Sequence, residues 1–247
     1  MRIIDVHAHL GRDLSDDLSQ TPGELLARMD QAGIERSVVF PFEGGPDVVA
    51  ENERVLEAAA KHRDRLIPFW AIVPTVPSLE REELANRVAA AAKRTDGIKG
   101  IVLNPTMHTY KIAHPYIVRL CEMMGGLGMP VMLHHTGTWG DEMGSVPDLV
   151  RRCPSVNFIV PNPTWTAGAV SLFKDFPNVY YDVSKSYGDV TYRILADAVG
   201  TGRLLFGSEA PKMDPGFEVT KLRAYRFSED ELHDVAFRNA ARLLRVA

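Results

Sequence analysis

The sequence has few cysteines and no long apolar segment. Its 247 residues include two cysteines, Cys121 and Cys153, which are too few for a disulfide framework and form no CxxC motif. The first residues, MRIIDVHAHL, lack a cationic flank followed by a long apolar core, so we expect no signal peptide. No apolar run has the length that spans a membrane. These absences predict a cytoplasmic protein that does not bind a membrane.

A basic surface is also missing. The chain has 28 lysine and arginine residues against 32 aspartate and glutamate residues, which gives a formal net charge of −4. Because no basic block offsets this balance, binding to nucleic acid is not expected. We expect a small-molecule substrate as the partner, and self-association as a homodimer is left open.

Strand-like and helix-like patterns alternate along the whole chain. Eight apolar runs predict strands at Arg2–Val6, Ser37–Pro41, Leu66–Ile72, Ile98–Leu103, Pro130–His134, Asn157–Val160, Val179–Val183 and Arg203–Phe206. Helical patterns lie between them. This alternation predicts a single α/β domain, residues 1–247, folded as a (β/α)8 barrel of the TIM type. A doubly wound open sheet is the alternative, but no glycine-rich dinucleotide fingerprint follows the first strand.

Two histidines, His7 and His9, lie in the run IIDVHAHL at the end of the first predicted strand. Side chains two positions apart on a strand point to the same face. Two neutral imidazoles on one face suit zinc, or manganese or iron with help from a carboxylate. The spacing alone is a weak signal, because neighbouring histidines also occur as ordinary hydrogen-bonded polar residues.

The predicted barrel places more polar residues beside this pair, because the chemistry of such barrels lies at the carboxyl ends of the strands. The residues at these ends are His134 and His135 after the fifth strand, Asn104 after the fourth, Asn162 after the sixth and Glu209 after the eighth. Their convergence on one rim is a far more specific signal for a metal-dependent active site than the first pair alone.

These motifs resemble the amidohydrolase superfamily, specifically the amidohydrolase-related branch that includes metal-dependent decarboxylases, lactonases and other hydrolases. The resemblance extends from IIDVHAHL through GIKGIVLNP, MPVMLHHTG, NVYYDVS and GRLLFGSEAP to the closing RNAARLL. Carried over to matching positions, it implies that His7, His9 and His135 bind one divalent metal ion, zinc or alternatively manganese or iron. Because His135 directly precedes Thr-Gly, as in the family, His134 is expected to point elsewhere and to pack or form a hydrogen bond.

Two positions depart from the family pattern. Asn162 stands where the family usually has a histidine, and an amide orients a carbonyl but transfers no proton near neutral pH. Glu209 stands where the family usually has an aspartate, and it is expected to act as a metal ligand and to handle a proton. A binuclear site bridged by Lys99 is not expected, because Lys99 begins its strand whereas Asn104 follows the other end.

Further residues near the same rim are candidates for substrate contacts. Three tryptophans, Trp70, Trp139 and Trp165, would line an apolar or aromatic pocket, although core or loop packing is an equal alternative. The polar candidates are Asn104, His108 and Lys185, together with Glu43 and Lys212. A lysine that faces the metal would favour an anionic substrate such as a carboxylate.

The sequence favours a metal-dependent hydrolase of a small amide, ester or lactone, with Glu209 as general base and Asn162 beside the carbonyl oxygen. The alternative is a metal-dependent decarboxylase of a small aromatic or unsaturated carboxylic acid, in which Glu209 handles the proton that replaces carbon dioxide. A second alternative is a barrel that has lost hydrolysis and acts as a metal-free enzyme or a ligand-binding protein.

Overall fold

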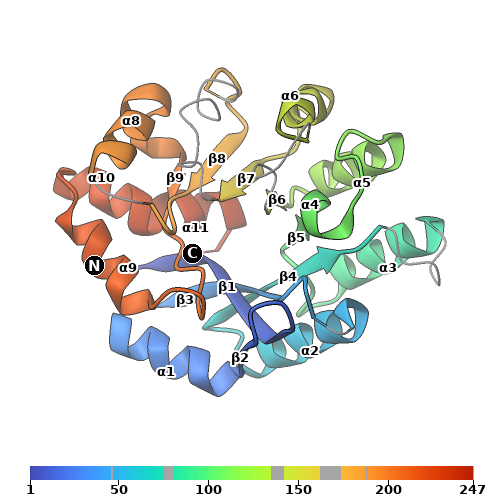
Figure 1. Cartoon of the computed structure of the whole chain (residues 1–247), viewed down its shortest axis with the longest axis horizontal. Coiled ribbons are helices and arrows are strands. Elements are labelled where there is room, and N and C mark those ends of the chain that lie inside the picture. The colour runs from blue at the N-terminus through green and yellow to red at the C-terminus, as the bar shows by residue number, and fades with distance from the viewer. Residues whose placement is uncertain (46, 75–80, 135–141, 162–173, 187–188, 247) are drawn as a thin grey trace.

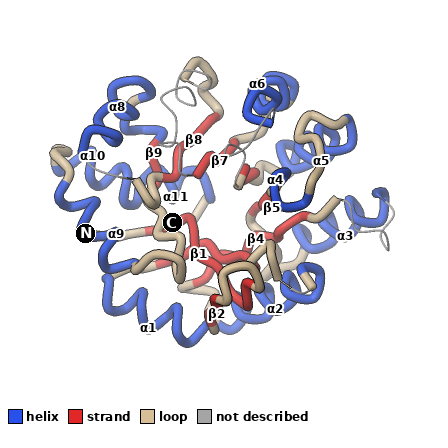
Figure 2. The backbone as a smooth tube through the Cα atoms, in the orientation of Figure 1, coloured by secondary structure: helices blue, strands red, loops and turns tan. Residues whose placement is uncertain are grey.

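The computed structural model describes residues 1–45, 47–74, 81–134, 142–161, 174–186 and 189–246. Within these ranges the predicted alternation of strands and helices is confirmed. The strands lie inside and the helices surround them, as Figures 1 and 2 show. In the described part of the chain, no helix has both the length and the apolar character needed to cross a membrane.

The described strands form one sheet of nine, in the order β2-β1-β3-β4-β5-β6-β7-β8-β9. Their bounds are β1 Ile4–Asp13, β2 Leu18–Gln20, β3 Arg36–Pro41, β4 Leu66–Ile72, β5 Gly100–Leu103, β6 Val131–Leu133, β7 Phe158–Pro161, β8 Val179–Asp182 and β9 Leu204–Leu205. β1 pairs with β2 in antiparallel orientation, and every other neighbouring pair is parallel. The parallel strands therefore carry their carboxyl ends at the same rim.

The first strand is longer than predicted. The prediction ends it at Val6, whereas β1 continues through both histidines to Asp13, because it pairs with β3 as far as Leu10 and its last three residues pair with β2. The β1–β2 hairpin has no counterpart in the prediction.

Hydrogen bonds also join β1 to the segment after β9. The amide of Val6 donates to the carbonyl of Phe206 at 2.9 Å, and the amide of His9 donates to that of Ala210 at 2.8 Å. In the other direction, the amide of Glu209 donates to the carbonyl of His7 at 2.7 Å. These bonds place Glu209 next to His7, although 202 residues of sequence separate them.

The helices begin and end where the sequence supplies caps. Their bounds are α1 Pro22–Ala32, α2 Val48–Lys61, α3 Arg81–Lys93, α4 Pro105–His108, α5 Pro115–Gly126, α6 Glu142–Arg152, α8 Asp189–Val199, α9 Pro215–Ala224, α10 Glu229–His233 and α11 Asn239–Leu244. Thr21 and Glu24 form a capping box at the start of α1, because each side chain bonds the other residue's backbone amide. Ser228 and Glu231 do the same for α10, which continues through a π-helical turn, Asp234–Arg238, into α11.

Two apolar clusters follow from the alternation of side chains along the strands. The larger cluster packs the outer faces of the strands against the surrounding helices. The smaller contains side chains from β1, β3, β4, β5, β6, β7 and β9 together with Ala240, Leu243 and Leu244 of α11. Phe69 belongs to this inner cluster and its neighbour Trp70 to the outer one, as the period of two along a strand requires.

Candidate metal centre

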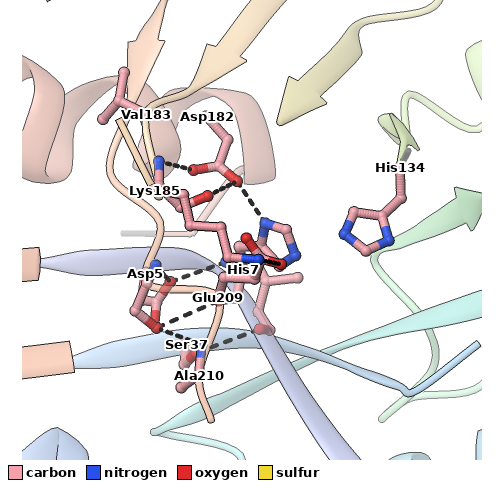
Figure 3. Close-up of polar contacts among 12 residues, drawn as sticks. Asp5, His7, Ser37, His134, Asp182, Val183, Lys185, Glu209 and Ala210 are labelled. Atoms are coloured by element: carbon pink, nitrogen blue, oxygen red, sulfur yellow. Dashed lines mark hydrogen bonds and ion pairs between the residues drawn. The ribbon is translucent and has the colours of Figure 1, made fainter. Parts of the chain in front are cut away.

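Four buried side chains converge at the carboxyl-end rim. They are His7 and His9 of β1, His134 directly after β6, and Glu209 after β9, and their ligand atoms all lie within 4.8 Å of one another. The ring centroids of His7 and His134 are 4.8 Å apart, and those of His7 and His9 are 5.2 Å apart. Figure 3 shows the ring of His134 beside that of His7.

Asp182, the last residue of β8, holds the ring of His7. Its Oδ2 lies 2.6 Å from Nδ1 of His7, and both side chains are buried. Burial alone lowers the pKa of His7, but the charge and hydrogen bond of Asp182 outweigh it and raise that pKa. In the neutral ring, with Nδ1–H donating to the carboxylate, Nε2 is the acceptor, and it has no hydrogen-bond partner among the described residues. This is the arrangement that orients a metal-binding imidazole.

Glu43, in the loop after β3, does the same for His134. Its Oε1 lies 2.7 Å from Nδ1 of His134, with both side chains buried. Asn104 Nδ2 donates to the same oxygen at 3.4 Å, and His108 Nε2 lies 3.1 Å from the backbone carbonyl of Glu43. The loops after β3 and β5 therefore set the position of His134.

His9 lies between two phenylalanine rings. Its ring stacks on Phe42, with centroids 4.8 Å apart and planes 7° apart, and meets Phe40 edge-on at 4.6 Å. Burial first, and then the nearby His7, hold the pKa of His9 well below its usual range. Neither ring nitrogen has a hydrogen-bond partner among the described residues. A buried polar atom without a partner costs about 1–3 kcal/mol, and a bound metal ion removes that cost for one nitrogen.

Glu209 contributes an ionised carboxylate to the group. Its backbone lies in the left-handed region at φ 57°, and Lys185 Nζ donates to its Oε1 at 2.6 Å. Burial alone raises the pKa of Glu209, but the charges of His7, His134 and Lys185 outweigh burial and hold it below its usual range. Lys185 is partly exposed, so it places a positive charge between the buried carboxylate and solvent.

Gly207 lets these segments approach each other. A Cβ at this position would collide with the carboxylate of Asp182. Only a residue without a side chain fits between the carboxylate and the segment that leads to Glu209. The sequence Phe206-Gly207-Ser208-Glu209 is therefore adapted to the contact between Asp182 and His7.

The donor set fits one divalent metal ion. Three imidazoles and one carboxylate are nitrogen and oxygen ligands of the kind that bind zinc, manganese or iron. His7, His9, His134 and Glu209 would hold the ion, and Asp182 and Glu43 would orient two of the imidazoles.

The structure corrects one prediction about the histidines. His134 forms a hydrogen bond, as expected, but the prediction that it points elsewhere is wrong, because its ring lies in the buried group that could hold a metal ion. The reason is the period of two along β6. Met132 lies in the inner cluster, so residue 134 shares its inward direction. His135 lies outside the described residues, so its role as a ligand stays a prediction.

The other predicted site residues lie in different places. Asn104 and His108 contact Glu43, and Lys185 contacts Glu209, so the structure brings all three to the metal centre. Trp70 packs in the outer apolar cluster, so the structure does not bring it to the rim. The remaining predictions, Asn162, Trp139 and Trp165, lie outside the described residues.

Two residues that orient the histidines have weak signals in the sequence. Asp182 has no predicted role, although an aspartate that ends an apolar strand at the active rim is a recognisable candidate. Glu43 is predicted only as a substrate contact, whereas it bonds His134. Nothing in the local sequence of either residue specifies its histidine, because the partners are 175 and 91 residues away.

Comparison with known proteins identifies the family and agrees with the fold. The family model described as "Amidohydrolase" matches residues 4–246. The 5-carboxyvanillate decarboxylase of Sphingomonas paucimobilis has a similar fold, with a TM-score of 0.80 and 16% identity, over 100% of this chain and 99% of that chain. The 2,6-dihydroxybenzoate decarboxylase of Rhizobium gives a TM-score of 0.76 and 17% identity, over 99% and 98% of the two chains.

A third similar structure contains a metal ion. The dihydroxybenzoic acid decarboxylase of Polaromonas sp. JS666, solved with bound manganese, gives a TM-score of 0.77 and 16% identity, over 99% of this chain and 97% of that chain. No curated protein matches the sequence. Because the family match covers nearly the whole chain, the protein belongs to the amidohydrolase family of enzymes.

Proposed function

We propose that this enzyme is a metal-dependent decarboxylase of a small aromatic carboxylic acid. The observation that carries the proposal is the ion pair between Lys185 Nζ and Glu209 Oε1, 2.6 Å apart beside the buried histidines. It places a partly exposed cation next to the metal ligands, where an anionic substrate would be attracted and oriented. The three solved structures named above, all decarboxylases by name, support the same choice.

The same ion pair makes hydrolysis the weaker candidate. A hydrolase of amides, esters or lactones needs a general base that accepts a proton from water, and the best base has a pKa near the working pH. Lys185 donates to Oε1 of Glu209, and the same carboxylate would be a metal ligand, so it is poorly placed to accept a proton from water. In a decarboxylation, Lys185 would instead orient the substrate's carboxylate, the bond to that carboxylate would break, and a proton from solvent would replace the carbon dioxide.

The chain's own residues supply binding and orientation in this reaction. His7, His9, His134 and Glu209 would hold the metal ion, which would supply Lewis-acid stabilisation of developing negative charge. Lys185 attracts the anionic substrate. The rings of Phe42 and Phe40 pack against His9 and hold its ring in place. His7 and His134 cannot rotate without breaking their bonds to Asp182 and Glu43. The site is thus organised before substrate arrives.

We further propose zinc or manganese as the resident ion and a closed (β/α)8 barrel as the architecture. The bonds from β1 to the segment after β9 support closure, with β2 as an addition to the eight parallel strands. Nitrogen ligands favour zinc, and the manganese in the Polaromonas decarboxylase supports the alternative.

A substrate panel tests the proposed function. Protein reconstituted with zinc or manganese is assayed for carbon dioxide release from hydroxylated benzoates, including 2,6-dihydroxybenzoate and 5-carboxyvanillate. Parallel assays measure hydrolysis of lactones, esters and amides. We expect carbon dioxide from at least one benzoate, lost in His9→Ala. Hydrolysis of the panel without any decarboxylation would contradict the proposal and restore the hydrolase.

A further inference from the structure

The opposite rim of the sheet carries a pocket that the metal centre does not explain. It lies where β3, β4 and β5 begin, whereas the metal ligands lie toward the carboxyl ends of the parallel strands. Its volume is about 130 Å³. Leu66, Pro68 and Val246 form part of an apolar wall.

Three cations from different parts of the chain line this pocket. Arg36 begins β3, Arg63 lies between α2 and β4, and Lys99 directly precedes β5. Asp96 is the acid among the described lining residues, and Arg63 lies 3.6 Å from it. The side chains around the pocket therefore carry an excess of positive charge.

Arg36 lacks an acceptor for one of its donors. Its Nε is buried and has no hydrogen-bond partner among the described residues. The neighbouring Glu35 is already engaged, because Arg2 donates to both of its carboxylate oxygens at 2.7 and 2.8 Å. Because Arg36 lines the pocket, an acceptor bound there would satisfy a donor that the described residues leave unpaired.

We propose that this pocket binds a small oxyanion, a phosphate or carboxylate group, between Arg36, Arg63 and Lys99. The planar fork of an arginine matches both kinds of group, and the ammonium of lysine adds a point charge. A pocket of about 130 Å³ has room for a group of this size. The apolar wall contacts the uncharged side of the ligand.

Thermal unfolding with added anions tests the site. Potassium phosphate and potassium acetate are titrated against potassium chloride at matched ionic strength, because general salt effects are common to all three. We expect a saturable rise in Tm with phosphate or acetate above that in chloride. A rise with phosphate alone identifies a phosphate site, and a rise with acetate alone identifies a carboxylate site.

Variants localise the effect. Lys99→Gln is expected to weaken the anion's apparent affinity by about tenfold or more, as for a lost charge-assisted hydrogen bond. Lys93→Gln makes the same charge change on the exposed end of α3, outside the pocket, and should bind as the wild type does. Arg36→Gln provides a second pocket variant, and if it fails to fold, the two lysine variants decide.

The Tm shifts of Lys99→Gln and the wild type distinguish the pocket from the metal centre. Anions that bind at the metal centre would shift Tm equally in Lys99→Gln and the wild type, because that centre lies at the other rim. Equal shifts in these two proteins, or no shift beyond chloride in the wild type, would overturn the proposal.

Discussion

Two buried carboxylates decide which nitrogen of each histidine faces the metal centre. Asp182 accepts a hydrogen bond from Nδ1 of His7, and Glu43 accepts one from Nδ1 of His134. Both bonds are short and lie in the interior, where a lost partner is costly. The affinity for a metal ion bound here is therefore expected to depend on residues that would not touch the ion.

Replacing Glu43 tests this dependence. Glu43→Gln keeps the size of the side chain but removes the charge that orients His134, so the affinity for zinc or manganese should fall by about tenfold or more. Competition with a chelator measures it. Glu57→Gln on the exposed face of α2 is the matched control. Equal affinities in the two variants would show that Glu43 does not orient the ligand.

Replacing Gly207 tests the contact between Asp182 and His7. In Gly207→Ala the added methyl collides with the carboxylate of Asp182, so the contact to His7 must shift. We expect a loss of about 1–3 kcal/mol in the free energy of unfolding, together with weaker metal binding. Gly126→Ala, whose Cβ meets nothing within 4 Å, should leave metal binding unchanged. Denaturant titration and chelator competition measure the two effects, and a Gly207→Ala protein with wild-type metal affinity would refute the steric argument.

At the scale of elements, helix α2 completes the pairing of a strand. The pairing of β3 with β4 ends at Val39 and Pro68, whereas β4 continues to Ile72. Beyond that point the side chain of Asn52 replaces β3. Its Nδ2 donates to the carbonyl of Ala71 at 2.8 Å, and its Oδ1 accepts from the amide of Ala71 at 2.9 Å. A side chain thus satisfies both backbone groups of a buried strand residue.

Asn52→Ala should therefore destabilise the fold without touching the metal centre. Two buried backbone groups lose their partners at about 1–3 kcal/mol each, so the free energy of unfolding should fall by about 2–6 kcal/mol. Urea titration measures the change, with Asn157→Ala at an exposed position as the matched control. A change below about 0.5 kcal/mol, the usual range of surface substitutions, would mean that Ala71 finds other partners.

The strands and the ligand-bearing β1 could be predicted because their evidence is local. Apolar runs and the spacing of His7 and His9 lie within a few residues. Whether His134 or His135 points inward depends on which residues of β6 face the inside of the sheet. The resemblance to the family's Thr-Gly motif pointed to His135 and gave the wrong orientation for His134. The β1–β2 hairpin and the role of Asp182 could not be predicted, because each depends on pairing that only the fold creates.

At the scale of the whole molecule, Asp5 links the two ends of the sheet. Its Oδ1 accepts from the amides of His7 and Ser208 at 2.9 Å, and its Oδ2 accepts from Ser208 Oγ at 2.6 Å. Burial raises the pKa of Asp5 to about 7, against its ordinary value of 3.8. The folded chain therefore retains a proton that the unfolded chain has released between these two pH values, so Asp5 makes the fold less stable as the pH rises through this window.

Asp5→Asn should remove that dependence. The amide oxygen still accepts from both backbone amides, and no ionisation remains. In metal-free protein, the free energy of unfolding of the variant relative to the wild type should rise from pH 4.5 to pH 7.5. Urea titrations across this range measure the difference. A constant difference between the two proteins would show that Asp5 does not titrate in this window.

The metal content of purified protein tests the central claim most directly. Elemental analysis after reconstitution and dialysis should find about one zinc, manganese or iron ion per chain in the wild type, because His7, His9, His134 and Glu209 form one ligand group. The double variant His7→Ala, His9→Ala loses two of three imidazoles and should retain almost none. A folded double variant with full metal occupancy, or a wild type that binds no metal, would contradict the account.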